Sequence, residues 1–147
     1  MQLVGRNDNA LTLSVNGYQF PNAVDDWDAN WLVIRVDVRN DEGSWSATHP
    51  CLTTRELAEL ADWLERPNGE LRFTEPNLEL EVVGREGDDV ELKVWFELEL
   101  RPDWAESWVA GERDLSAALT VSRQELVQAA AELRGELAAF PPRGGWT

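Results

Sequence analysis

The chain has 147 residues and a formal net charge of −15, because 28 acidic residues outnumber 13 basic ones. Charge of that sign repels phosphate backbones and anionic lipid headgroups, so we expect no direct binding to nucleic acid or membranes. It also accelerates encounter with basic partners, although acidity that serves only solubility explains the same number. One cysteine excludes an internal disulfide, and one histidine beside it cannot complete a structural zinc site. The length predicts a single domain over residues 1–147, and the absence of a secretion-signal pattern predicts a cytoplasmic protein.

Alternation of apolar and polar residues predicts four strands in the first half of the chain. They are expected at residues 2–5, 11–15, 30–39 and 44–49. In the third strand, the apolar residues at every second position from Leu32 to Val38 share one face, and a turn at residues 40–43 reverses the chain. A one-residue choice of register decides which face Trp45 occupies, and the sequence leaves that choice open.

The periodicity stops between the second and third strands, so residues 18–28 are predicted to form a loop. Asp25, Asp26 and Asp28 surround Trp27 in this loop. Three carboxylates can gather a hard cation, but these lack the glycine and the distal glutamate of a calcium loop and are equally explained as solvated acids. We predict no metal site and keep the loop as a candidate contact surface.

Residues 54–66 are predicted to form an amphipathic helix. Thr53 and Glu56 have the spacing of a capping box, in which each side chain accepts a hydrogen bond from the backbone N–H of the other residue. Apolar residues then recur at helical spacing from Leu57 to Leu64 and form one stripe. Pro67 cannot continue the helix, so the helix is expected to end before it.

The second half of the chain repeats the order of the first. Strands are expected at residues 70–74, 78–83, 90–101 and 115–121, followed by a helix at residues 123–139 that Ser122 and Glu125 cap. The strand at 90–101 is long and is expected to cross the middle of the sheet. Four strands, a helix, four strands and a helix predict an α+β fold: a largely antiparallel sheet of about 7–8 strands that carries two capped helices.

An outward strip of charged residues surrounds Trp95 on the strand at 90–101. Pairing with the preceding strand sets Glu79 opposite Trp95, and the same register sets Glu81 opposite Lys93. A tryptophan among carboxylates suits contact with a basic protein, because tryptophan is enriched at interface hot spots and complementary charge raises association rates. The alternative is a tryptophan that a second layer of the same fold covers. The candidate partner-binding residues are Trp95, Glu91, Glu97, Glu99, Glu79, Glu81, Asp25, Asp26 and Asp28.

The residues offer no positive sign of catalysis. His49 and Cys51 lie close in sequence, but this spacing does not establish the hydrogen-bonded geometry of a nucleophilic pair, and a small buried thiol beneath the helix explains Cys51 better. The connection at residues 102–114 holds Trp104 and Trp108, so it is either packed by its tryptophans or functional. An enzyme or small-ligand-binding protein with an acidic, Trp-lined cleft is therefore the alternative function.

Several stretches of the chain together resemble one protein family. They are residues 28–32 (DANWL), 45–48 (WSAT), 50–53 (PCLT), 61–64 (ADWL) and 73–78 (FTEPNL), with a closing helix that ends in Phe140-Pro141 before Arg143. On these residues the chain is similar, over about residues 10–140, to the WapI-type immunity proteins, which are small acidic bacterial proteins.

The resemblance implies a cytoplasmic protein that neutralises the toxic C-terminal domain of a contact-dependent or polymorphic toxin, in some systems a nuclease acting on tRNA. It supplies no catalytic residues and no cofactor. An acidic inhibitor of a basic nuclease agrees with the net charge of −15. We therefore predict an immunity protein, not an enzyme, that forms a stoichiometric complex with a cognate basic toxin domain.

Overall fold

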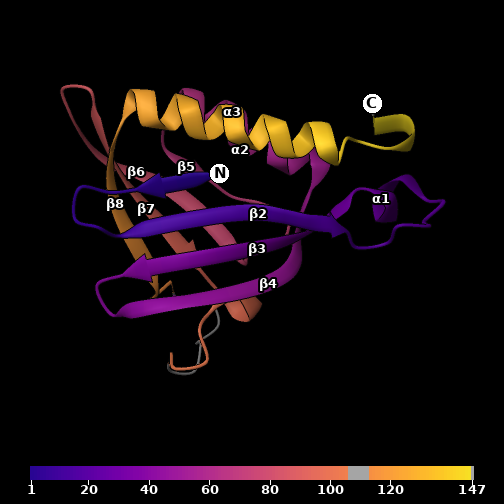
Figure 1. Ribbon diagram of the computed structural model, residues 1–147, viewed down its shortest axis with the longest axis horizontal. Coiled ribbons are helices and arrows are strands. Elements are labelled where there is room, and N and C mark those ends of the chain that lie inside the picture. The colour runs from indigo at the N-terminus through magenta and orange to yellow at the C-terminus, as the bar shows by residue number, and fades with distance from the viewer. Residues whose placement is uncertain (106–112, 147) are drawn as a thin grey trace.

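The computed structural model describes residues 1–105 and 113–146, and its strands form two four-stranded antiparallel sheets (Figure 1). The first sheet is ordered β1 (Gln2–Val4), β2 (Ala10–Tyr18), β3 (Trp31–Asn40) and β4 (Gly43–Thr53). The second sheet is ordered β5 (Glu70–Leu71), β6 (Leu78–Glu86), β7 (Asp89–Phe96) and β8 (Ser116–Ser122). The predicted α+β fold with antiparallel strands is confirmed, although the strands divide between two sheets and do not join one.

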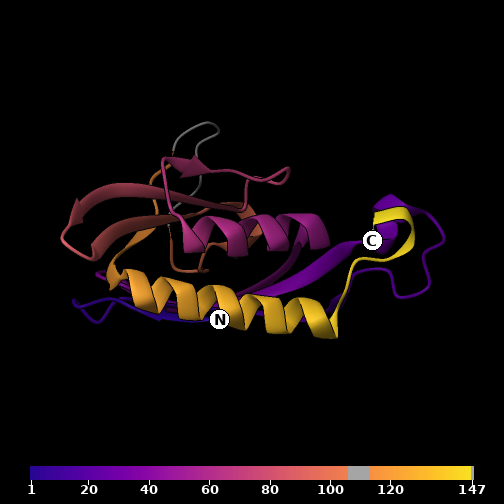
Figure 2. The same cartoon turned by 90° about the horizontal axis from the view of Figure 1, so that it is seen from above.

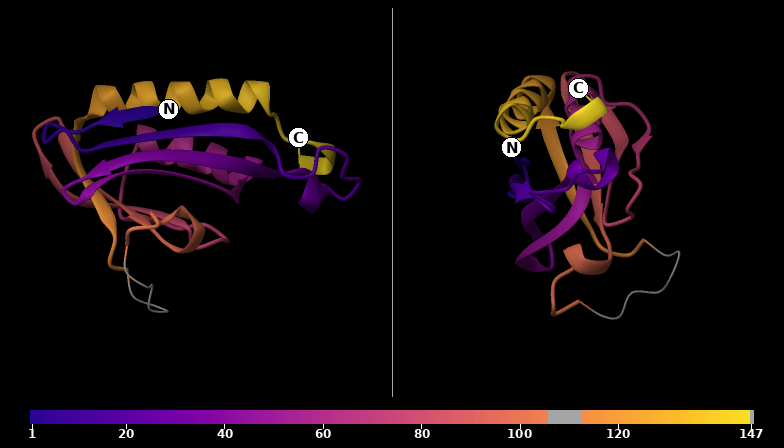
Figure 3. Two further views of the ribbon diagram at one scale, coloured as in Figure 1. Left: turned by 60° about the horizontal axis from the view of Figure 1, so that its bottom comes forward. Right: turned by 90° about the vertical axis from the view of Figure 1, so that its right-hand side faces the viewer.

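A long helix follows each sheet. These helices are α2 (Thr54–Glu65) and α3 (Arg123–Ala139), and shorter helical turns are α1 (Asp26–Ala29), η1 (Leu98–Leu100) and η2 (Gly144–Trp146). The two long helices lie side by side and enclose a hydrophobic core with the inward faces of both sheets (Figures 2 and 3). Buried side chains from each layer meet there, among them Leu13, Ile34, Leu57, Leu60, Leu92, Val94, Leu126 and Leu133.

Local hydrogen bonds fix where the long helices begin. Thr53 Oγ1 accepts from the Glu56 N–H at 3.2 Å, and the Glu56 carboxylate accepts from the Thr53 N–H at 3.0 Å. Ser122 and Glu125 make the same pair of bonds at the start of α3, at 3.1 Å each. Both predicted capping boxes are therefore confirmed, and they satisfy backbone donors that a helix cannot bond internally.

Strand faces and register follow the sequence pattern closely. On β3 the alternate positions from Leu32 to Val38 are at most 4% exposed. Glu79 lies opposite Trp95 and Glu81 lies opposite Lys93, as predicted. The face that the sequence left open is settled for Trp45, which is 9% exposed and donates its indole N–H to the Leu100 carbonyl at 2.9 Å.

The strand predicted over residues 90–101 is wrong at its end. Strand β7 crosses the middle of the second sheet but stops at Phe96. Opposite Trp95 and Phe96 the neighbouring strands also reach their ends, so no described strand remains for the following residues to pair with. Leu98 takes a φ of 52° and turns the chain into η1, which returns Leu100 to the core.

The connections between paired strands differ in length. Two residues join β3 to β4, and two join β6 to β7, whereas residues 19–30 connect β2 to β3 although these strands are paired up to Tyr18 and Leu32. This connection, which we call the projection, extends beyond the end of the sheets beside residues 144–146 (Figure 1). The sequence predicts a loop over residues 18–28, and the structure adds the one-turn helix α1 at the end of it.

Candidate partner-binding surfaces

The carboxylates of the outward strip on β6 and β7 are already paired with bases. The Arg113 guanidinium lies 3.1 Å from Glu79, 3.5 Å from Glu70 and 4.0 Å from Glu81. Arg72 adds contacts of 2.9 Å to Glu70 and 3.8 Å to Glu79. The side chains of Glu79 and Glu81 are only 13% and 19% exposed. This part of the strip therefore offers a partner little free negative charge.

Trp95 is half-buried beneath two basic side chains. Its ring lies 4.7 Å from the Arg113 guanidinium and 5.3 Å from the Lys93 ammonium, both within cation–π range. The indole Nε1 is buried and has no hydrogen-bond partner among the described residues. The alternative raised from the sequence, a tryptophan covered by its own fold, describes this position better than an exposed contact residue does.

The remaining strip residues lie apart from one another. Glu91 is exposed near the start of β7. The prediction that Glu97 faces outward is wrong, because the chain leaves strand geometry after Phe96 and Glu97 is only 6% exposed. Burial and the nearby Glu79 carboxylate raise the pKa of Glu97 above its usual range. Glu99 lies on η1, where its carboxylate is 3.6 Å from the His49 ring.

Each aspartate of the projection has a different role in it. Asp25 caps α1, because its Oδ1 accepts from the backbone N–H of Trp27 at 2.6 Å. Asp26 accepts from the N–H of Gly145 at 3.0 Å, which joins α1 to η2. The Asp28 carboxylate is exposed and has no hydrogen bond to another described residue. No arginine or lysine in the described ranges forms a salt bridge with these three aspartates.

The projection also exposes large apolar side chains, which the sequence reading of the site missed. Phe20 is 43% exposed, Val24 is fully exposed and Trp27 is 47% exposed. The Trp27 ring makes edge contacts with Trp31 at 5.3 Å and with Trp146 at 5.8 Å, so one side of the ring is held and the other faces solvent. The available signal was the presence of these apolar residues in a segment without strand or helix periodicity, where no core requires them.

Comparison with known protein families identifies the chain over nearly its whole length. The immunity protein WapI-like family matches residues 2–141. The chain belongs to this family. Membership makes it a toxin-neutralising immunity protein that binds a cognate toxin, and it confirms the resemblance seen in the sequence. Comparison with curated proteins and with solved structures gives no match.

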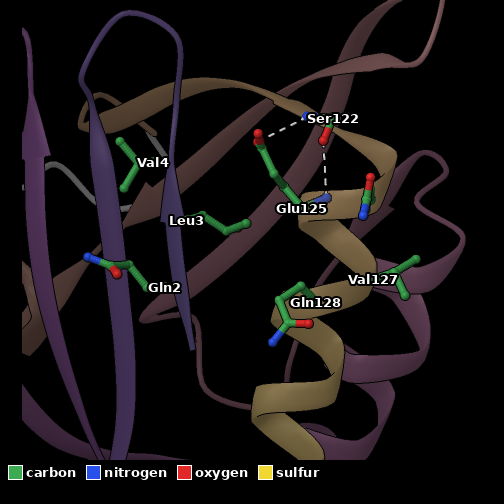
Figure 4. A pocket seen from close by; sticks show the side chains of 8 residues that line it. Gln2, Leu3, Val4, Ser122, Glu125, Val127 and Gln128 are labelled. Atoms are coloured by element: carbon green, nitrogen blue, oxygen red, sulfur yellow. Dashed lines mark hydrogen bonds between the residues drawn. The ribbon is translucent and has the colours of Figure 1, made fainter.

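One hollow of this immunity protein, of about 650 Å³, lies between β1 and α3 and does not gather catalytic groups (Figure 4). Leu3 points from the strand toward the helix there, and Glu125 is bonded to Ser122 in the capping box (Figure 4). Its lining includes glutamines and exposed valines, and Glu125 is its one carboxylate. An acid pair or nucleophile with a base is therefore not assembled at this hollow.

The alternative function, an enzyme or ligand-binding protein, places a Trp-lined cleft near Trp104. In the structure this tryptophan packs against the core. A hollow of about 320 Å³ lies beside Trp104, whose ring makes an edge contact with buried Trp45 at 5.7 Å. The one aspartate in its lining, Asp114, is paired with Arg101 at 2.5 Å. Trp108 lies outside the described residues. Glu42 is the other carboxylate that lines the hollow, so one of its two acids is already paired with a base.

Cys51 and His49 do not form a nucleophilic pair. Cys51 is fully buried, and burial together with the Glu56 carboxylate raises the pKa of its thiol to about 12, so it stays protonated at neutral pH. The His49 ring instead lies 3.6 Å from the Glu99 carboxylate. The thiol is therefore part of the core.

No described helix combines the length and apolar character that a membrane span needs.

Proposed function

We propose that this immunity protein neutralises its toxin in the cytoplasm by forming a stoichiometric complex with a basic toxin domain, and that the projection contacts the toxin. One observation carries the proposal: Phe20, Val24 and Trp27 are exposed among Asp25, Asp26 and Asp28 on one short segment. Apolar anchors surrounded by unpaired acids match the anatomy of an interface for a basic protein. A nuclease domain fits this chemistry, because a surface that holds a phosphate backbone is basic.

The fold itself does not require a connection of this length. Strands β2 and β3 are antiparallel neighbours, and hairpins of that kind close with two to five residues. Residues 19–30 place twelve residues there, including the solvent-exposed Val24 and Trp27. Exposed apolar side chains on an ordered segment add nothing to the core, so their contribution is expected at an interface.

The strip on β6 and β7 is the weaker of the two candidate surfaces. A toxin that binds Glu79 or Glu81 has to separate them from Arg113. The attraction between the toxin and these glutamates is therefore offset by the loss of their attraction to Arg113. Glu91 is exposed and forms no salt bridge with another described residue, so it remains a free acid on that face. It provides a matched control for the acids of the projection.

The test begins with the toxin domain that the tagged protein captures from the source bacterium, purified separately. Titration calorimetry should give a 1:1 complex, and the complex should block the toxic activity. The double variant Val24→Arg with Asp28→Lys should weaken binding by at least about 100-fold, because both positions then repel a basic partner and one apolar contact is lost. Neither side chain bonds to another described residue, so folding should be unchanged.

The control variant Glu91→Lys changes a charge by the same sign on the other face and should alter the affinity by less than about threefold. If Glu91→Lys abolishes the complex while the double variant still binds tightly, the projection is not the contact surface. If no stoichiometric complex forms with the captured domain, the proposed mechanism of neutralisation is wrong.

A further inference from the structure

Residues 141–146, which we call the strap, lie against the projection from the far end of the sequence. The Tyr18 hydroxyl donates to the Pro141 carbonyl at 2.5 Å, and the Gly145 N–H donates to Asp26 at 3.0 Å. Trp146 packs edge-on against Trp27, and the Arg55 guanidinium lies 4.4 Å above its ring. The strap and the projection therefore form one assembled unit beyond the sheets (Figure 1).

Asn30 is the polar centre of this unit. It is fully buried, and every hydrogen-bonding position of its side-chain amide is used. Its Nδ2 donates to the carbonyls of Asp26 at 2.6 Å and Arg143 at 3.0 Å. Its Oδ1 accepts from the Thr54 hydroxyl at 2.8 Å and from the Arg143 N–H at 2.9 Å. One side chain thus connects the projection, the strap and the start of α2.

Arg143 completes the connection from the strap. Its guanidinium donates to the carbonyls of Ala29 at 2.8 Å, Pro21 at 2.9 Å and Phe20 at 3.0 Å. It also lies 3.8 Å above the Tyr18 ring. None of these carbonyls lies in a strand, and Ala29 is the last residue of α1, so a single side chain satisfies acceptors at both ends of the projection. The position of the Arg143 guanidinium therefore sets the distance between the two ends of the projection.

The projection cannot hold this shape alone. A four-residue helix such as α1 is far below the roughly 12–15 residues at which isolated helices become even marginally stable. Fixing the backbone costs conformational entropy at every residue, and any part of that cost incurred on binding is subtracted from the affinity. If the shape is already fixed in the free protein, nearly every encounter meets a competent surface.

We infer that Asn30 and Arg143 are positioning residues for toxin binding, which hold the projection in its binding conformation before the toxin arrives. This inference rests on the proposed function of the projection. The inference predicts that contact residues and positioning residues affect different rate constants of toxin binding. Residues that touch the toxin control mainly the dissociation rate, whereas loss of a positioning residue lowers the competent fraction and therefore the association rate.

The test compares Arg143→Ala with Arg134→Ala, which removes an exposed arginine of α3 that pairs with Asp62 and Glu65 away from the projection. Backbone hydrogen exchange is measured without toxin, and surface plasmon resonance gives both rate constants with the captured toxin domain. Arg143→Ala should accelerate exchange in residues 19–30 and lower the association rate, each by at least about tenfold, with the dissociation rate within about twofold. Arg134→Ala should change neither quantity.

Two further variants guard against a general loss of folding. Arg143→Lys keeps the charge and part of the hydrogen bonding, and should restore an intermediate association rate. Asn30→Asp replaces the donating amide nitrogen by an oxygen that faces two carbonyl oxygens, and should reproduce the Arg143→Ala pattern.

Unchanged exchange in Arg143→Ala would show that the strap does not hold the projection. Faster exchange with an unchanged association rate would show that the fixed shape does not govern binding, and an effect on dissociation alone would make Arg143 a contact residue. If the wild type does not bind the toxin domain, the proposed function fails, and the exchange measurement still decides whether Arg143 holds the projection.

Discussion

The projection and the strip on β6 and β7 have the same composition, a tryptophan among carboxylates, and opposite surroundings. The strip lies within a sheet and next to residue 113, so Lys93, Arg72 and Arg113 reach its acids and its tryptophan. The projection lies beyond the sheets, where the bases are otherwise engaged. Arg143 bonds backbone carbonyls, and Arg55 stacks on Trp146. The sheet acids Glu79 and Glu81 therefore meet a base from a distant segment, whereas Asp28 of the projection forms no salt bridge with a described residue.

Among the single substitutions that test this comparison, Trp27→Ala should have the largest effect. The exposed half of the Trp27 ring is the largest apolar group that the projection presents, and truncating such an anchor typically costs 2 kcal/mol or more of binding energy. We expect the toxin to bind at least about 30-fold more weakly, a change that titration calorimetry resolves. If Trp27→Ala keeps the wild-type affinity, the apolar anchor for the toxin lies on another surface.

Trp95→Ala should show the reverse pattern. The ring is half-buried beneath Arg113 and Lys93, so its loss is expected to lower the free energy of unfolding by about 2 kcal/mol. Toxin affinity should stay within about twofold. Urea denaturation and calorimetry on the same variant separate these effects. An unchanged unfolding midpoint combined with weakened binding would show that the strip on β6 and β7 contacts the toxin.

Glu97→Gln should produce the smallest effect, visible in the pH dependence of stability. Burial and Glu79 raise the pKa of Glu97 above its ordinary value of 4.5, so the folded state binds more protons than the unfolded state just above that value. Protonation of Glu97 therefore favours folding as the pH falls toward 4.5, and this contribution is lost as the pH rises through the raised pKa. The stability of the wild type relative to Glu97→Gln should increase as the pH falls.

Denaturant unfolding of both proteins at several pH values between 7 and the ordinary glutamate pKa tests this sign. A constant difference between them would mean that Glu97 titrates normally and that its burial carries no electrostatic cost. An opposite trend would mean that Arg101 and Arg113 stabilise the charged form more than burial disfavours it.

The elements predicted correctly are those that neighbouring residues specify. Both capping boxes act over three residues, so Thr53 with Glu56 and Ser122 with Glu125 locate the helices without knowledge of the fold. The residues that share a strand face are also specified locally, because side chains point to alternate faces along a strand. The pairing of Glu79 with Trp95 follows when the buried faces of β6 and β7 are placed on the same side of the sheet. Composition also marks the acidic loop as a candidate contact surface, and this stays a prediction that the binding experiments test.

The sequence by itself determined the family, through motifs spread along the chain. It also determined the helix starts and the register of β6 against β7, because these depend on residues close together in the chain. Tertiary structure alone decided that β7 ends at Phe96, since the ends of its neighbours set the length of its ladder. It also decided which acids stay free, because Arg113 approaches Glu79 from 34 residues away. Arg143 meets Asn30 across 113 residues, and only folding brings such groups within hydrogen-bonding distance.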